Sequence, residues 1–145
     1  MKKIKKTTIF VLLSAILLSG TVCAASKPGF NFSLTNSGQA YNKMSDTYNK
    51  KTIKSDPWTI YVSSITCSGT YGISFCPVRY NSSTNAIIKK CTNSAVWRHS
   101  TGGTTVSYAS GDAYLSDYRL AARMDDSYQS TFKATGWFNA DKVSY

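Results

Sequence analysis

The chain has a single histidine, His99, which would have to serve any catalytic site that depends on an imidazole. In such a site His99 would activate a serine or cysteine nucleophile, and Asp112 or Asp117 would orient the ring. However, His99 stands beside Ser100 and just before a glycine-rich turn, which is typical of a solvent-facing histidine, and the sequence has no G-x-S-x-G motif. We therefore predict that the protein is not an enzyme and has no catalytic residues. A small secreted hydrolase centred on His99 is the alternative.

The acidic residues offer little for catalysis or metal binding. All 7 are aspartates, so a glycosidase with the usual pair of carboxylates would have to rely on aspartate alone. Asp125 and Asp126 are sequence neighbours that are ordinary in a turn, and they lack the spacing of an EF-hand. A zinc site is disfavoured because the chain has one histidine and no C-x-x-C pair. We expect no metal and no cofactor.

The chain has four cysteines, and Cys23 lies in an N-terminal segment that we expect to be removed. The other three, Cys67, Cys76 and Cys91, are the candidates for a disulfide bond. Disulfides persist in exported proteins, and an odd number of cysteines leaves one thiol over. Cys67 and Cys76 flank a stretch with two glycines, so a bond between them would close a hairpin if their Cα atoms came within about 5.5 Å. Cys91 is then a buried apolar residue, part of an intermolecular bridge, or the partner of either other cysteine. All three pairings stay open.

The first 24 residues have the pattern of a secretory signal peptide. Four lysines precede an apolar run from Ile9 to Leu18, and small residues up to Ala24 provide a cleavage site. The run is shorter than the ~20 residues of a membrane-spanning helix, so we expect a secreted protein without a stable membrane span. Lipidation at Cys23 is the alternative, although Val22 in front of it fits the lipoprotein pattern poorly.

Cleavage after Ala24 would lower the net positive charge of the mature chain. The whole chain has 17 Lys and Arg residues against 7 acidic ones, and loss of the four leader lysines leaves 13 against 7, a net charge of +6. The remaining cations form pairs and not a long basic stripe: Lys50 with Lys51, Lys89 with Lys90, and Arg119 with Arg123. This distribution argues against nucleic acid as a partner and favours an anionic component of the bacterial envelope.

Aromatic residues are too numerous for one small core, with 10 tyrosines and 3 tryptophans. Exposed tyrosine and tryptophan on a flat sheet face stack on sugars or contact partners, although tyrosine is also an ordinary strand residue. We expect Trp58 and Trp97 in the core, and Tyr41, Tyr48 and Tyr71 exposed in loops. The candidate binding residues are Tyr118, Arg119, Arg123 and Trp137.

Two-residue alternation of apolar and polar residues predicts β-strands after residue 57. The alternation that starts at Trp58 slips in phase at Ser64, as a β-bulge would cause. Pro77 predicts an edge strand or a strand end, and the glycines Gly102 and Gly103 predict a hairpin turn. In residues 113–124 every charged side chain falls on one parity, which favours a strand over the rival helix.

These strands predict an all-β fold, a small antiparallel β-sandwich of about seven or eight short strands. We expect three parts: a signal peptide at residues 1–24, a polar N-terminal arm with one short strand at residues 25–57, and the sandwich domain at residues 58–145.

Three segments occur in a fixed order: Pro-Trp-Thr-Ile-Tyr-Val at 57–62, Tyr-Arg-Leu-Ala-Ala-Arg at 118–123, and Ala-Thr-Gly-Trp-Phe-Asn-Ala-Asp at 134–141. Together they resemble uncharacterised small secreted β-sandwich proteins of Gram-positive bacteria, which are distantly similar to lactococcin-type bacteriocins. The resemblance covers about residues 56–141. It implies a role in antagonism or at the envelope, and it supplies no catalytic residues.

We therefore expect a secreted, non-enzymatic binding protein that acts at the bacterial envelope and is bacteriocin-like. The alternative within binding proteins is a glycan-recognition module that uses exposed aromatic residues. We expect the protein to be a monomer or to associate weakly.

Overall fold

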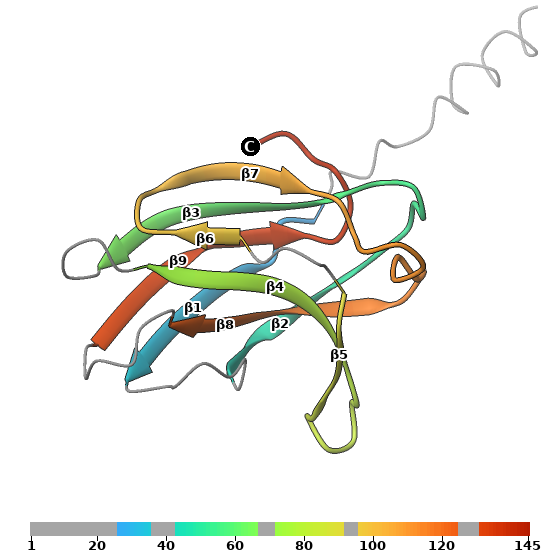
Figure 1. Ribbon diagram of the computed structural model, residues 1–145, viewed down its shortest axis with the longest axis horizontal. Coiled ribbons are helices and arrows are strands. Elements are labelled where there is room, and N and C mark those ends of the chain that lie inside the picture. Colours follow the sequence, from blue (N-terminus) through green and yellow to red (C-terminus); the bar gives the residue numbers. More distant parts are fainter. Residues whose placement is uncertain (1–25, 36–42, 67–71, 92–95, 125–130) are drawn as a thin grey trace, which may run out of the picture.

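The computed structural model describes residues 26–35, 43–66, 72–91, 96–124 and 131–145, and within these ranges the chain forms nine β-strands and no helix. The strands make two antiparallel sheets that lie one above the other (Figure 1). Sheet A has the order β1 (Gly29–Thr35), β9 (Thr131–Asn139), β3 (Trp58–Thr66), β7 (Gly102–Val106). Sheet B has the order β2 (Lys43–Lys50), β8 (Asp117–Met124), β4 (Ile73–Tyr80), β5 (Ile87–Lys90), and β6 (Val96–Arg98) also pairs with β4. The expected all-β sandwich is confirmed.

The segment expected as an N-terminal arm contributes a strand to each sheet. β1 pairs along its whole length with β9, and β2 pairs with β8. β1 is the one short strand expected in this arm, and residues 30–34 alternate between apolar and polar side chains. A register shift between Met44 and Tyr48 interrupts β2 and its alternation, so sequence patterning missed this strand. The sandwich therefore begins at β1 and not at Trp58.

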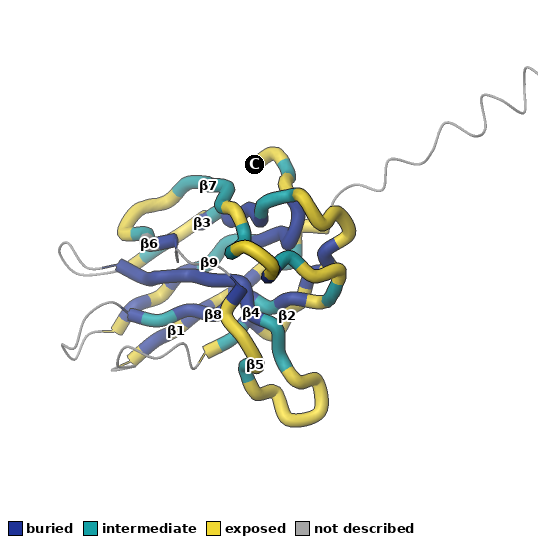
Figure 2. Tube along the Cα trace, turned by 45° about the vertical axis from the view of Figure 1, so that its right-hand side comes forward, coloured by how far each residue is buried: buried dark blue, intermediate teal, exposed yellow. Residues whose placement is uncertain are grey.

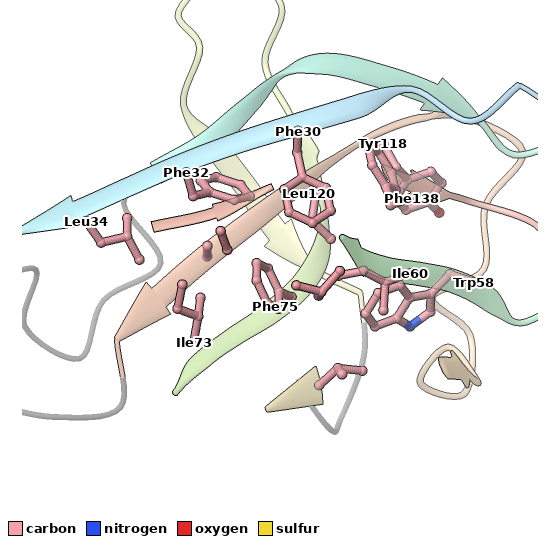
Figure 3. Packing of buried hydrophobic residues seen from close by; sticks show 14 of the residues in the cluster. Phe30, Phe32, Leu34, Trp58, Ile60, Ile73, Phe75, Tyr118, Leu120 and Phe138 are labelled. Atoms are coloured by element: carbon pink, nitrogen blue, oxygen red, sulfur yellow. The ribbon is translucent and has the colours of Figure 1, made fainter. Parts of the chain in front are cut away.

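The core lies between the sheets, and buried residues recur along the long strands, most densely in β4 (Figure 2). In β8, Tyr118, Leu120 and Met124 are fully buried, as the alternation predicts, and the rival helix is wrong. Trp58 is also fully buried, as expected, whereas the side chain of Trp97 lies outside the described residues. Figure 3 shows the cluster, which both sheets supply: Phe30, Phe32, Leu34, Trp58, Ile60, Ile73, Phe75, Tyr118, Leu120 and Phe138.

Two irregularities shape sheet A. The register of β3 against β9 shifts between Val62 and Ser64, which confirms the predicted bulge. Gly136 of β9 lies opposite Val62, and a Cβ atom there would collide with the backbone carbonyl of Tyr61 and approach the ring of Phe30 to 2.8 Å. Only glycine allows the two strands to approach this closely.

Pro77 and the pair Gly102 and Gly103 occupy positions in the sheets that differ from those expected. β4 is an inner strand, and Pro77 pairs with Leu120 on one side. On its other side the neighbour changes: β6 pairs with residues 73–75 and β5 with residues 78–80. The missing N–H of proline is tolerated at this break in pairing. Gly102 and Gly103 form the start of β7 and not the turn, with a positive φ of 129° at Gly102.

The described cysteines carry free thiols. Cys76 and Cys91 are both buried and are not in a disulfide bond. Cys67, the other half of the expected Cys67–Cys76 bond, lies outside the described residues. The free thiol of Cys76 gives no support for that bond. Burial raises the pKa of the Cys76 thiol to about 12 and also raises the pKa of Cys91.

The predicted signal peptide, Cys23 included, also lies outside the described residues. Across the part of the chain that the structure describes, no helix has the length and apolar character to cross a membrane.

Candidate binding surfaces

Three aromatic side chains form a row across the outer face of sheet A. Tyr61 on β3 lies opposite Trp137 on β9, and their ring centroids are 5.7 Å apart with an interplanar angle of 13°. The ring of Tyr145, from the C-terminal tail, follows at 6.3 Å from Tyr61. Lys27 Nζ lies 4.5 Å from the centroid of the Trp137 ring. We call Trp137, Tyr61 and Tyr145 the aromatic row.

The tail positions Tyr145 over β7. Val143 N donates a hydrogen bond of 3.2 Å to Thr59 Oγ1 on β3, and the Tyr145 ring then packs on Gly103. A Cβ atom at Gly103 would lie 2.5 Å from Tyr145 Cγ, so this close packing needs glycine. Tyr145 is nevertheless 63 % exposed, whereas Tyr61 and Trp137 are partly exposed.

Apart from Lys27, the groups described around the aromatic row are hydroxyls. Ser64 Oγ and Thr135 Oγ1 are 2.9 Å apart across β3 and β9. Thr59 and Thr105 form a similar but longer pair, at 3.4 Å, across β3 and β7. The four strands of sheet A contain one charged residue, Lys133. The outer face of sheet A is therefore aromatic and polar but almost uncharged.

A buried ion pair fixes the point where the tail leaves β9. Lys51 is fully buried, and its Nζ donates to Asp56 O at 2.6 Å, Ala140 O at 3.0 Å and Asp141 Oδ1 at 3.0 Å. These three hydrogen bonds use all the donors of the ammonium group. Lys51 Nζ also lies 4.4 Å from the centroid of the Tyr108 ring.

Both carboxylate oxygens of Asp141 also accept hydrogen bonds from within the protein. Its Oδ2 accepts hydrogen bonds from Thr52 N at 2.8 Å and Thr52 Oγ1 at 2.6 Å, and its Oδ1 accepts one from Ile53 N at 3.2 Å. Burial by itself raises the pKa of the Asp141 carboxyl, but the hydrogen bonds from Thr52, Lys51 and Ile53 outweigh it and hold this pKa below its usual range. The Lys51–Asp141 pair has its bonds satisfied internally and is structural.

A cleft of about 570 Å³ lies beside this ion pair, between the residues after β2 and the tail. Its exposed rim includes Tyr48 and Ile53, which are 56 % and 50 % exposed. Its floor includes Asn49, whose Oδ1 accepts from Ala140 N at 2.8 Å and whose Nδ2 donates to the Ser26 carbonyl. These polar groups hold the sandwich end together. Tyr48 is exposed as expected, but it lies in β2 and not in a loop, and the other two tyrosines expected in loops, Tyr41 and Tyr71, lie outside the described residues.

The predicted binding residues lie in three different places. Trp137 belongs to the aromatic row on sheet A, whereas Arg119 and Arg123 lie on the outer face of sheet B, opposite Val78 and Ser74 of β4. Tyr118 is fully buried in the core. The structure therefore does not bring the four candidates together, and it removes Tyr118 as a surface contact.

Buried Tyr118 satisfies its hydroxyl locally. The hydroxyl accepts a hydrogen bond from Tyr114 N at 2.9 Å and lies 3.1 Å from the Asp112 carbonyl oxygen, to which it can donate. Its polar end thus stabilises the turn before β8. A tyrosine on the apolar parity of a strand was the sequence signal for this core position.

The groups of the alternative catalytic site have surroundings that do not favour catalysis. His99 is exposed, after β6. Asp112 is bound to Lys89 in a salt bridge of 2.5 Å, and the described thiols are buried with raised pKa values, which disfavours the reactive thiolate. Within the described ranges, no three His, Cys or Asp side chains gather as a metal site.

Comparisons with known proteins identify no relative. No family model matches the sequence, no curated protein is significantly similar, and no solved structure matches the fold. The resemblance to small secreted β-sandwich proteins therefore stays a prediction.

Proposed function

We propose that the protein is a secreted, non-enzymatic binding protein of the bacterial envelope and that it recognises a polysaccharide through the aromatic row. The observation that carries this proposal is the side-by-side placement of Trp137, Tyr61 and Tyr145 on one solvent-facing sheet. A bacteriocin-like role, which the resemblance implies, stays a prediction alongside it.

The chemistry of the row suits a sugar chain. The apolar faces of sugar rings pack on aromatic side chains, and tyrosine and tryptophan supply large contact areas at low cost in conformational entropy. Lys27 and the neighbouring serine and threonine hydroxyls would hydrogen-bond sugar hydroxyls. Lys27 is the charged group at the row itself, and the strands of sheet A add one more charged residue, Lys133, so an uncharged ligand meets few charges there.

The row also extends across strands, with one ring each over β9, β3 and β7. Successive rings are 5.7 and 6.3 Å apart, so a ligand that contacts all three must be longer than one ring. This geometry favours an oligosaccharide chain over a single sugar.

The test is retention on purified bacterial cell-wall polysaccharide from which phosphate-containing polymers have been stripped. Trp137→Ala and Tyr145→Ala should each weaken binding about tenfold, the usual effect of losing a central aromatic contact. Tyr48→Ala is the matched control, since Tyr48 is 56 % exposed on β2 of the other sheet.

Circular dichroism and thermal unfolding should show that all three variants keep the fold. Equal retention of the Trp137→Ala and Tyr48→Ala variants, or no retention of the unaltered protein, would refute the proposal.

A further inference from the structure

The two sheets differ sharply in charge. The strands of sheet B contain eight Lys and Arg residues against two Asp, whereas those of sheet A contain one Lys and no acid. The two acids are Asp117, at the start of β8, and Asp46, in the irregular part of β2. The basic character that the sequence spreads along the chain is therefore concentrated on one layer of the sandwich.

Strand register shows which cations share the outer face of sheet B. In antiparallel pairs, directly opposite residues point to the same face. Cys76, Val78 and Ala121 cluster apart from the main core, so their face is the outer one. Arg119 lies opposite Val78, which in turn lies opposite Lys90.

Arg123 belongs to the same face, because it is four residues from Arg119 on β8 and opposite Ser74. We call Lys90, Arg119 and Arg123 the basic triad. The apolar floor beneath it is formed by Cys76 and its neighbours.

Arg119 is held in place by two contacts. Its Nη1 donates a hydrogen bond of 2.9 Å to Asn85 Oδ1, and its guanidinium carbon lies 4.3 Å from the centroid of the Tyr80 ring. Neither contact neutralises its charge. A guanidinium whose plane is fixed loses less conformational entropy when it binds a phosphate group.

We infer that the basic triad on the outer face of sheet B binds a phosphodiester-linked polyanion, a polymer of polyol phosphate. Charge complementarity carries this inference, together with the spacing of the cations. Arg119 and Arg123 are four residues apart, about 13 Å along the strand, and Arg119 and Lys90 are two strand spacings apart, about 10 Å. These are separations of backbone positions, and a polymer that carries several phosphate groups can contact all three side chains at once.

A polymer without bases fits this face better than nucleic acid. Proteins that bind single-stranded nucleic acid offer open aromatic faces for base stacking, and here the guanidinium of Arg119 covers a face of Tyr80. The site lies on the opposite side of the sandwich from the aromatic row and does not depend on it.

The experiment measures binding of the purified protein to poly(glycerol phosphate) at several salt concentrations. Counterion release predicts a steep salt dependence, with a slope of about −2 in a plot of log K against log salt for three phosphate contacts. Lys90→Gln and Arg119→Gln should each reduce the affinity about fivefold at low salt and make the slope shallower by about one. Inorganic phosphate should compete poorly.

Lys133→Gln and Lys142→Gln are the matched controls, since they remove the same charge from sheet A and from the tail. Unchanged binding by these controls supports the triad, whereas an equal loss would show that only net charge matters and would overturn it. No binding at low salt would also overturn it.

Equally tight, triad-dependent binding to single-stranded DNA or to phosphatidylglycerol vesicles would overturn the assignment to a polyol phosphate. The test of the aromatic row uses a polysaccharide without phosphate, and the test of the basic triad uses a polymer of glycerol phosphate. Loss of binding in one test therefore leaves the other proposal unaffected.

Discussion

Replacing Asp141 with alanine should be among the most destabilising single changes in the molecule. The change removes the carboxylate that lies 3.0 Å from Lys51 Nζ and leaves a fully buried ammonium with two carbonyl partners, those of Asp56 and Ala140. Breaking a buried ion pair from one side costs about 3–5 kcal/mol, because the remaining charge is uncompensated. The lost bonds from Thr52 add little, since Thr52 is exposed and water can replace them.

Thermal unfolding measures the effect directly. For a domain of this size each kcal/mol lowers Tm by roughly 4 °C, so Asp141→Ala should lower Tm by about 12–20 °C at neutral pH. Asp117→Ala, which removes an exposed aspartate, is the control and should change Tm by no more than about 2 °C.

The same carboxylate predicts an acid limit. Because the folded-state pKa of Asp141 lies below its ordinary value of 3.8, its contribution to stability is complete above that value and is lost as the pH falls below it. The loss of Tm between pH 5 and pH 2 should be smaller in Asp141→Ala than in the unaltered protein. A fall in Tm of less than 4 °C for Asp141→Ala at neutral pH, or an identical acid profile, would refute the reasoning.

Two further predictions concern close packing and the thiols. Gly136→Ala should destabilise the protein by about 2–3 kcal/mol, because the added methyl group would collide with the Tyr61 carbonyl and the Phe30 ring; denaturant unfolding measures it, and a change below about 0.5 kcal/mol would contradict the packing described. Cys76 and Cys91 should react with Ellman's reagent at pH 8 only after denaturation, since both thiols are buried with raised pKa values; rapid reaction of either in the folded protein would contradict their burial.

Periodicity predicted the fold well wherever a strand keeps its phase. Residues 117–124 keep one phase, with charged side chains on one parity only, and form β8, although the expected strand began at residue 113. The slip at Ser64 was also visible as a bulge. β2 was missed because its irregularity leaves Ser45, Asp46 and Thr47 between the paired segments, so that its polar residues resemble a loop. The local sequence pattern does not predict a strand that is stabilised mainly by pairing with a neighbouring strand.

The candidate binding surfaces were predicted in part. Trp137, Arg119 and Arg123 were identified from residue type, and the parity of Tyr61 opposite Ile60 would have placed it outside the core. Tyr145 could not be found in this way, because a tail that folds back over the sheet leaves no periodic signal.

The ion pair could not be predicted either. Lys51 stands in a polar stretch and resembles any surface lysine. Its partner Asp141 is 90 residues away, and only the closed sandwich brings the two together.

The position of β9 in sheet A bears on the order in which the parts of this sheet can form. β9 is the last strand to be synthesised, yet it pairs with both β1 and β3, so sheet A cannot assemble until the C-terminal residues are available. A chain threaded through a secretion channel from its N-terminus would therefore remain unfolded during transit, because pairing between distant segments has to wait for the later one. If the chain is exported through such a channel, as its N-terminal pattern predicts, this strand order delays the folding of sheet A until translocation is complete.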